Sequence, residues 1–528
     1  MMTLAQTITK LRTDAGLTEQ KFAEKLYVTR QIVQRWEKGT AQPELATLIR
    51  MAKMFGLTLD ELVLSVDPKE QSVLRQDKEI KPDPKAGQWW EVYADEMRTE
   101  YRQSMEEGLD IERYAGLFEE VAKMESCSVK DALADALYQL IRTAPIRADY
   151  TYDEPSDLPA IKALRKPHPV EGTVPTGKAL ENKIAGAWYG RIAGCLLGKP
   201  VECIRTTDLH PLLKASGNYP MHRYIRSTDI TEEIAANSKF WLKGRCYADT
   251  VTCMPWDDDT NYTVLGQILI ERCGRDFIPQ DVANIWLNLQ PKDAYCTAER
   301  VAFCNFIRGF APPASAVYKN PYREWIGAQI RGDYFGYVNP GDPETAADMA
   351  WRDAAISHVK NGIYGEMFIS AMIACAAKTD SIEDIILGGL GEIPATSRLY
   401  ESILQVVEDY RGGVSQEEAF AKIHEKWDET NSHDWCHTIS NAMIVAAALL
   451  YGKGEFGPSI CMAVQACFDT DCNGATVGSI LGMRGGIDSI GEEWIAPICD
   501  TLETPIFGVG KAKISTLVEK TLKHIPQN

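Results

Sequence analysis

Glycine recurs at every fourth position in two separate segments, and this spacing restricts how the chain can fold. The first repeat runs from Gly186 to Gly198 and the second from Gly474 to Gly482. Four-residue spacing places the glycines on one side of a helix, where each costs about 1 kcal/mol relative to alanine. Such a repeat needs a compensating contact, so we expect two helices with closely packed backbones. Arg191 and the short apolar length exclude a membrane-spanning dimer.

Carboxylates cluster beside both glycine segments and before a third, apolar helical run. They are Glu202 after the first segment, Asp257, Asp258 and Asp259 before the apolar run, and Asp469 and Asp471 before the second segment. Close packing of the glycine helices is expected to bring these groups together. A solvated acidic cap explains one group alone, but three together favour a two-metal site. Oxygen ligands suit Mg²⁺ or Mn²⁺ better than zinc.

The first 63 residues, which we call the head, carry a helical pattern of their own. Thr18 and Thr29 suit helix N-caps, and Gly39 suits a helix end. The head has a net charge of +2, whereas the rest of the chain has −20. Because an acidic body repels phosphate backbones, any contact with DNA is expected through the head.

The head resembles the phage-repressor (Cro/XRE) type of helix-turn-helix domain over residues 4–63. The matching residues include Leu17-Thr18, Phe22-Ala23, Val28-Thr29 and the run from Arg35 to Gly39. The resemblance implies binding of double-stranded DNA by a homodimer, with a helix in the major groove. The residues it implies at the DNA are Gln20, Thr29, Arg30, Gln31 and Gln34. Arginine and glutamine suit base edges; the alternative is a head retained only for docking to protein.

The three carboxylate segments together resemble the signature of the ADP-ribosylglycohydrolase family, over about residues 155–505. Glu202 matches the glutamate of a G-x-P-x-E segment. Asp258 and Asp259 match the pair of a T-D-D-T segment, and Asp469 and Asp471 match that of a D-T-D-T segment. The resemblance implies an all-α domain with two Mg²⁺ or Mn²⁺ ions in a cleft. It implies metal ligands among the five aspartates, and Glu202, Asp258 and Asp469 as catalytic carboxylates.

Two positions depart from the family pattern. Asp257 stands at the first threonine of T-D-D-T, and Cys472 at the last threonine of D-T-D-T. One interpretation is compensation, in which Asp257 takes over charge and coordination while the soft Cys472 thiol stays outside the metal shell. We prefer it because all five matching carboxylates are present. The other interpretation is a degraded site that binds ligand without turnover.

The ligand cleft of the family corresponds to about residues 326–368, where the usual N-G-x-x-M-R pattern is absent. We expect Tyr334, Phe335 and Tyr337, in a Gly/Pro-rich loop, to stack an adenine or cover a ribose. His358 matches a Ser/Thr-His position of the family. Trp435 and His437 belong to a polar and aromatic cluster before a helix. All six are expected to bind substrate, with packing or capping as the alternative.

Four regions are expected in an all-α chain. They are a helix-turn-helix bundle (residues 1–65), a linker rich in proline and charge (66–88), a helical accessory segment and loop without chemical role (89–175), and a large ADP-ribosylglycohydrolase-like domain (176–528). The 14 cysteines form no C-x-x-C pair, which favours reduced thiols. Neither a signal segment nor a membrane span is visible, so we expect a cytoplasmic protein without membrane contact.

The first functional hypothesis is a metal-dependent hydrolase that cleaves a glycosidic bond to ADP-ribose or a related riboside, fused to a DNA-binding head. A carboxylate would deprotonate water for attack on the anomeric carbon. The alternative is a transcription regulator whose hydrolase-like body senses ADP-ribose or a nucleotide with little turnover. A third possibility is a nucleoside-type glycosidase, because the cleft segment departs from the family pattern.

Overall fold

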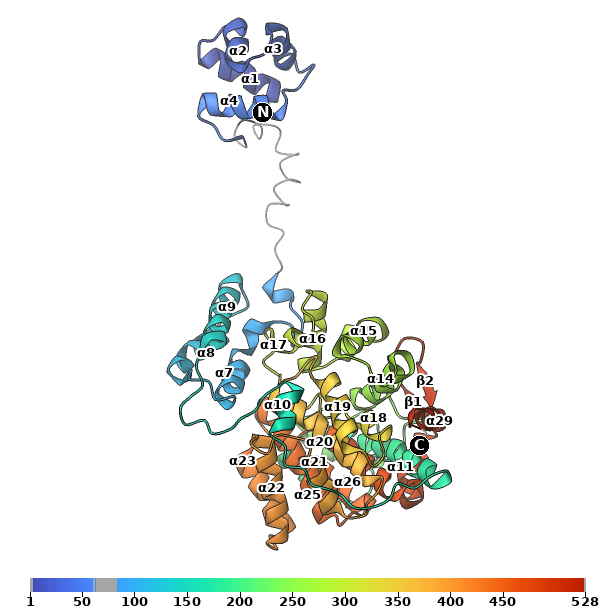
Figure 1. Ribbon diagram of the computed structural model, residues 1–528. Coiled ribbons are helices and arrows are strands. Elements are labelled where there is room, and N and C mark those ends of the chain that lie inside the picture. Colours follow the sequence, from blue (N-terminus) through green and yellow to red (C-terminus); the bar gives the residue numbers. More distant parts are fainter. Residues whose placement is uncertain (1–2, 60–61, 63–82, 527–528) are drawn as a thin grey trace. The chain divides into compact units, whose positions relative to one another are not determined.

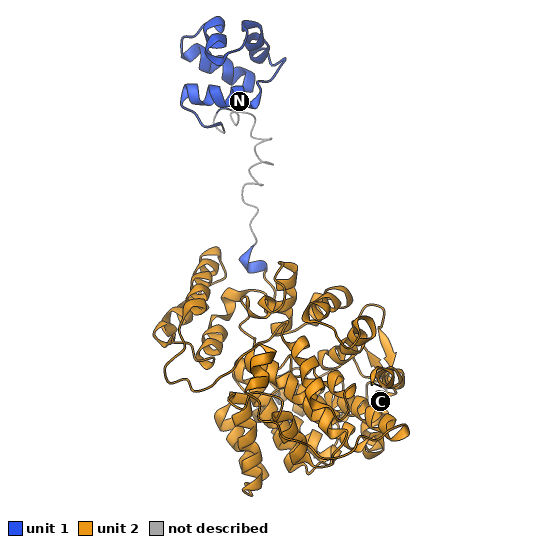
Figure 2. Cartoon of the chain, in the orientation of Figure 1, with its two compact units in different colours: residues 1–86 blue, residues 87–528 orange. Residues whose placement is uncertain are grey.

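A computed structural model describes residues 3–59, 62 and 83–526 of the chain. They form two compact units, residues 1–86 and 87–528 (Figures 1 and 2). The regular structure is helical, which confirms the expected all-α class, with one small addition. Two short antiparallel strands, β1 (Thr501–Glu503) and β2 (Lys511–Lys513), pair near the C-terminal end, with Leu502 opposite Ala512.

The head contains four described helices around a small core. They are α1 (Leu4–Asp14), α2 (Glu19–Leu26), α3 (Arg30–Glu37) and α4 (Leu45–Phe55). Phe22, Val33 and Trp36 are buried in this core. Thr18 caps α2 as expected, because its hydroxyl accepts a hydrogen bond from the Lys21 backbone N–H at 3.3 Å. Thr29 stands at the N-cap position of α3 without making such a bond.

The accessory segment packs three helices on a small hydrophobic cluster of its own. They are α7 (Met97–Glu106), α8 (Ala115–Lys123) and α9 (Ser128–Thr143), with short 3-10 turns at Tyr93–Glu96 and Glu112–Tyr114. Another 3-10 turn, Pro84–Ala86, precedes the segment and belongs to the first unit. Buried ion pairs join the accessory segment to the rest of the second unit. The guanidinium of Arg323 bonds to Glu100 at 2.9 Å and to Glu107 at 2.6 Å.

The rest of the second unit is a layered bundle of helices around one large apolar core (Figure 1). Its α-helices are α10 (Leu158–Ala163), α11 (Lys178–Gly198), α12 (Thr206–Ala215), α13 (Glu232–Asn237), α14 (Asp258–Cys273), α15 (Pro279–Leu289), α16 (Thr297–Ile307), α17 (Ala314–Val317), α18 (Asp333–Tyr337), α19 (Pro343–Ala354), α20 (Lys360–Ala376), α21 (Ile382–Leu390), α22 (Arg398–Arg411), α23 (Gln416–Lys426), α24 (Ser432–Cys436), α25 (Thr438–Tyr451), α26 (Phe456–Gln465), α27 (Thr470–Gly485), α28 (Glu492–Ile495) and α29 (Ile514–His524). Short 3-10 turns lie at Lys199–Val201, Ser227–Asp229, Lys292–Ala294, Ile487–Ser489 and Ala496–Ile498.

The two glycine-bearing helices, α11 and α27, pack against each other in antiparallel orientation, as their spacing predicts. Gly190 faces Gly478, and a Cβ atom added to Gly190 would lie 2.2 Å from the Gly478 carbonyl oxygen. At Gly194 the corresponding distance, to the carbonyl oxygen of Gly474, is 1.9 Å. Backbones this close leave no room for a side chain. The C-terminal end of α11 therefore meets the N-terminal end of α27, where the carboxylates lie.

Among the described residues, no helix is long and apolar enough to cross a membrane. All 14 cysteines lie within the described ranges, and all are free thiols, as the sequence predicts.

Candidate functional site

Three elements bring the predicted carboxylates together: the end of α11 with the turn after it, and the first turns of α14 and α27. The buried Arg191 of α11 fixes the position of α14. Its guanidinium donates to the Asp259 carbonyl oxygen at 2.6 and 2.9 Å, and pairs with the Asp259 carboxylate at 3.1 Å. It also pairs with Asp333 at 2.9 Å. A fully buried cation thus holds the first turn of α14 beside α11.

The carboxylate cluster comprises Glu202, Asp257, Asp258, Asp259, Asp469 and Asp471. Within it and two adjacent cysteines, three groups have ligand atoms within 4.8 Å of one another: Glu202 with Asp469 and Asp471, Asp259 with Asp471 and Cys472, and Cys195 with Asp257 and Asp259. The groups overlap through Asp259 and Asp471. Asp258 belongs to none of these groups, and as a residue it is half-buried at the same helix start.

Burial and mutual repulsion make this cluster costly to ionise. Burial raises the pKa of Glu202 to about 7, and the charge of Asp469 adds to the shift. Burial likewise raises the pKa of Asp469 to about 6 and that of Asp471 well above its usual value. Asp259 Oδ2 and Asp471 Oδ1 are buried without a hydrogen-bond partner among the described residues. Repelling carboxylates with unsatisfied oxygens are a donor set that fits a hard divalent cation.

Asp257 differs from the other carboxylates because both of its oxygens are engaged by the protein. Oδ1 accepts the backbone N–H of Asp259 at 2.9 Å, which caps α14, and Oδ2 pairs with Lys199 Nζ at 2.6 Å. Although burial opposes ionisation, Lys199 lowers the pKa of Asp257. We expected Asp257 to take over coordination while Cys472 stayed outside. That expectation stays a prediction: Lys199 pairs with Asp257, while Asp257 lies within 4.8 Å of Asp259, and the Cys472 thiol lies within 4.8 Å of Asp259 and Asp471.

The three aromatic residues expected to bind substrate require a correction. Tyr334, Phe335 and Tyr337 lie in the short helix α18 rather than in a loop, and none is more than 1% exposed. Phe335 stacks on Phe277 at 5.5 Å, and the Tyr337 hydroxyl donates to the Ala187 carbonyl oxygen at 3.1 Å. The Gly/Pro content of the segment suggested a loop, but apolar burial prevailed. Rings packed on all sides have no face for a ligand, so we withdraw these residues from the binding site.

His358 and Trp435 lie in different surroundings. His358 is buried beside Ser357, whose hydroxyl lies 2.8 Å from Nδ1, and burial lowers its pKa well below the usual value. Trp435 is half-buried, with the guanidinium of Arg205 5.1 Å from its ring centroid. The thiol of the next residue, Cys436, lies 3.9 Å from Asp469 Oδ2. Cys436 therefore borders the carboxylate cluster, and Trp435 precedes it in the chain. At His358, Ser357 engages Nδ1, whereas Nε2 is buried without a hydrogen-bond partner among the described residues.

His437 is fully buried and contacts Glu106 of the accessory helix α7, a segment to which the sequence assigned no chemical role. Glu106 Oε2 lies 3.4 Å from His437 Nε2 and 3.1 Å from His433 Nε2. The Nδ1 atoms accept hydrogen bonds from the Ile439 backbone and the Trp325 indole, so Nε2 carries the proton in both rings. Metals bind the unprotonated nitrogen. The two histidines therefore hold a carboxylate here rather than a metal, and nothing in the sequence around Glu106 indicates this contact.

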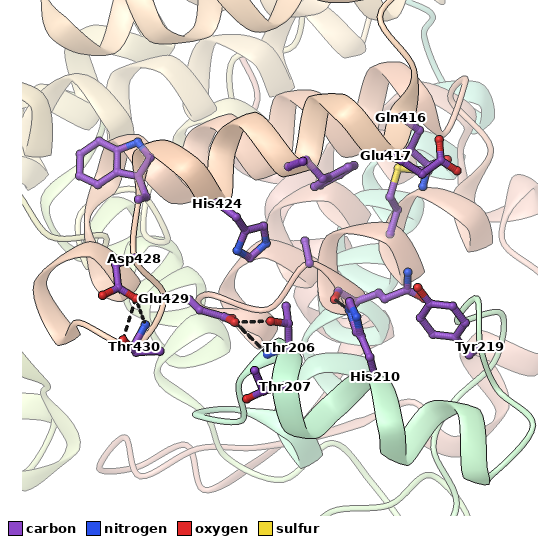
Figure 3. Close-up of a pocket in the computed structure, with 16 residues that line it drawn as sticks. Thr206, Thr207, His210, Tyr219, Gln416, Glu417, His424, Asp428, Glu429 and Thr430 are labelled. Carbon is purple, nitrogen blue, oxygen red and sulfur yellow. Dashed lines mark hydrogen bonds between the residues drawn. The ribbon is translucent and has the colours of Figure 1, made fainter.

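A pocket of about 740 Å³ is lined by residues of α12, α23 and α26 and by the segment that follows α23 (Figure 3). Figure 3 shows His424 projecting from α23 toward Thr206, the first residue of α12. Thr206 follows Glu202 by four residues, and its backbone N–H donates to Glu429 at 3.0 Å. The ring of Phe468, directly before Asp469, lies 5.0 Å from that of His424. None of the lining residues was predicted, because they come from segments that carry no motif.

The residues expected at DNA lie on the exposed side of α2 and α3. Thr29, Arg30, Gln31 and Gln20 are exposed, whereas Gln34 is half-buried. Arg30 and Gln34 both donate to Glu19 Oε2, at 2.8 and 2.7 Å. This carboxylate therefore holds two of the expected reading side chains in place.

Comparisons with known proteins match both the head and the rest of the chain. The family model of ADP-ribosylglycohydrolase matches residues 176–527, and a helix-turn-helix model matches residues 8–62. Since the first match covers most of the chain, the protein belongs to the ADP-ribosylglycohydrolase family. It also carries a Cro/XRE-type helix-turn-helix domain.

Two curated relatives match the head alone. The HTH-type transcriptional activator BcrR of Enterococcus faecalis is 37% identical over 62 residues, 12% of this chain and 30% of that protein. The SPbeta prophage-derived HTH-type transcriptional regulator YonR of Bacillus subtilis (strain 168) is 37% identical over 54 residues, 10% of this chain and 50% of that protein. The chain thus spans half or less of each relative. A solved structure described as an ADP-ribosylglycohydrolase-related protein complex has a TM-score of 0.42 at 18% identity, covering 66% of this chain and 99% of that one.

Proposed function

We propose that the second unit is a metal-dependent hydrolase that cleaves a glycosidic bond to ADP-ribose or a related riboside. One observation carries the proposal: in a member of this family, carboxylates from three distant segments lie within ligand distance and leave buried oxygens without partners among the described residues. Asp259, Asp469 and Asp471 would hold divalent cations, Mg²⁺ or Mn²⁺, two in number. Bound cations supply positive charge that orients the ribose hydroxyls or phosphates of the substrate.

The protein's own groups account for the remaining steps. Glu202 is half-buried, and its carboxylate lies beside those of Asp469 and Asp471, where a general base could reach water at the metal site. We propose that its carboxylate takes a proton from water as the water oxygen bonds to the anomeric carbon. The bond from that carbon to the acceptor nitrogen or oxygen breaks, and the acceptor leaves with the proton that Glu202 took from water. Asp258 and Asp469 stabilise the positive charge that develops on the sugar, and the 740 Å³ pocket offers room for part of the substrate.

The head is proposed to bind operator DNA as a homodimer through Gln20, Thr29, Arg30, Gln31 and Gln34. Their exposed positions on α2 and α3 support this, with Gln34 half-buried. A second function for the chain, a regulator that senses ADP-ribose with little turnover, is favoured by the ion pair between Lys199 and Asp257. In that pair a lysine ammonium, rather than a metal ion, neutralises the charge of Asp257.

The test is hydrolysis of ADP-ribosylated arginine, serine and nucleobase and of simple ribosides by the full chain, with Mg²⁺, with Mn²⁺ and with EDTA. We expect metal-dependent release from one substrate and its loss in Asp258→Asn. If no substrate is hydrolysed while ADP-ribose still raises the melting temperature, the result would instead support a regulator that senses ADP-ribose. Release that is unaffected by EDTA would refute the metal-dependent mechanism.

A further inference from the structure

A second pocket, of about 780 Å³, lies between the accessory segment and the rest of the second unit. One wall comes from α7 and residues 147–152, and the other from α22 and the end of α23. Its volume is within the range of about 300–1,000 Å³ that is typical of small-molecule sites. None of its lining residues belongs to the carboxylate cluster, and most precede residue 176, where the family match begins.

Basic side chains outnumber acidic ones in the lining of this pocket. Arg98, Arg102, Arg147, Arg398 and Lys426 line it, against the carboxylates of Glu106 and Asp149. Arg102, His433 and His437 already engage Glu106, and Asp149 is 82% exposed at the rim. Three of the basic side chains are also paired: Arg98 with Glu119, Arg102 with Asp434, and Arg398 with Glu154 and Glu324. Lys426 and Arg147 are therefore the lining cations with the least counter-charge.

Lys426 and Arg147 have the fewest protein partners among these cations. Lys426 Nζ donates to the Ser402 hydroxyl at 3.1 Å and forms no ion pair within the described part of the chain. Partial desolvation lowers the pKa of its amino group. The charge of Glu401 raises this pKa, whereas the charge of Arg398 lowers it further. Arg147 donates to the Met105 carbonyl oxygen at 3.0 Å, with a 3.4 Å contact to Asp149. Two cations facing one pocket with so little counter-charge suit an anionic ligand.

Aromatic side chains stand beside these cations. Tyr101, Tyr150, Tyr152 and Trp427 line the same pocket, and Tyr150 and Tyr152 pack edge to face at 5.5 Å. Trp427 stacks on His437, with ring centroids 5.0 Å apart, and is thereby held in place. Fixed rings next to positive charge suit a flat aromatic group that carries phosphate.

We propose that this pocket binds a small aromatic anion of the nucleoside phosphate class, at a site separate from the carboxylate cluster. A nucleic-acid strand fits less well, because the chain outside the head carries a net charge of −20. The proposal does not depend on hydrolase activity. Segment 433–437 contacts Glu106 on the side of this pocket and Asp469 on the side of the carboxylate cluster.

The test is calorimetric titration of the full chain in EDTA with ADP, ribose 5-phosphate and adenosine. We expect ADP to bind, and both fragments to bind at least about tenfold more weakly, since each lacks one of the two recognised features. Lys426→Met and Arg147→Met should each weaken ADP binding by about tenfold or more. Lys422→Met is the matched control, because Lys422 lies on the same helix outside the pocket and pairs with Asp409 at 3.1 Å.

Three results would overturn the proposal. ADP binding that is unchanged in the double variant of Lys426 and Arg147 would exclude the pocket. Loss of ADP binding in Asp469→Asn, but not in the double variant, would place ADP at the carboxylate cluster. If ribose 5-phosphate bound as tightly as ADP, the aromatic side chains of the pocket would not contribute to recognition. Melting temperatures of all variants verify that each chain is folded.

Discussion

At the scale of single residues, the pair of Lys199 and Asp257 most sharply separates this chain from the family pattern. Asp257 is 2% exposed, and Lys199 Nζ lies 2.6 Å from it. Removing one partner of a buried pair typically costs about 3–5 kcal/mol, because the other charge is left uncompensated. We therefore expect Lys199→Met to lower the melting temperature in EDTA, and Mn²⁺ to restore more stability to this variant than to the wild type.

The control for Lys199→Met is Lys243→Met. Lys243 pairs with Glu232 at 2.9 Å, but both side chains are more than half exposed, so we expect a change below about 1 kcal/mol. If the Lys199→Met variant melts like the wild type, with and without Mn²⁺, the pairing of Asp257 with Lys199 does not contribute to the stability of the fold.

His437 predicts a pH dependence of stability. Burial lowers its pKa to about 3, against about 6.5 when unfolded, so the folded state favours the neutral ring. Between these values the unfolded chain binds a proton that the folded chain does not. The stabilisation is therefore complete above about pH 6.5 and is lost as pH falls toward 3, by at most about 1.4 kcal/mol per unit.

The measurement for His437 is the melting temperature between pH 7 and pH 4.5. The wild type should lose stability more steeply than His437→Gln, which carries no titrating ring. His222→Gln, at an exposed histidine, should follow the wild type. Equal slopes for wild type and His437→Gln would show that the ring is not held neutral.

At the scale of elements, the contact between α11 and α27 positions the whole carboxylate cluster. A Cβ atom at residue 194 would lie 1.9 Å from a backbone carbonyl oxygen, so Gly194→Ala must push the helices apart. Overpacking costs about 1–3 kcal/mol or more, and we expect a lower melting temperature together with weaker metal binding. Gly116→Ala is the matched control: that helical glycine has nothing within 4 Å of the added atom, and alanine should stabilise it slightly. If both variants have the same melting temperature, α11 and α27 are not packed as closely as described here.

The sequence predicted this pair of helices well, because glycine at four-residue spacing has few explanations other than backbone contact. It also predicted the start of α2, through the Thr18 cap. It failed at α18, where glycine and proline suggested a loop while aromatic burial decided the structure. Glu106 was beyond prediction, because its histidine partners lie more than 300 residues away in sequence.

At the scale of the whole molecule, the two units are expected to work separately. Arg30→Ala with Gln34→Ala in the full chain should weaken binding to a selected DNA fragment by about 1–3 kcal/mol for each base that is no longer read. Hydrolysis should stay within about twofold of the wild type, because both residues belong to the first compact unit. Gel shift at several salt concentrations measures the first effect, with the exposed Lys10→Ala of α1 as control. Unchanged DNA affinity would support the docking alternative.

The proposal on which the enzymatic function depends is that the carboxylate cluster binds divalent metal, and equilibrium dialysis of Mn²⁺ against the full chain is its sharpest test. We predict saturable binding by the wild type, with a decrease of at least about tenfold in affinity when Asp469→Asn and Asp471→Asn are combined. The exposed Glu232→Gln serves as control and should bind as the wild type does. Equal Mn²⁺ binding by the wild type and the double variant would show that the cluster is not a metal site, whatever the enzyme assay shows.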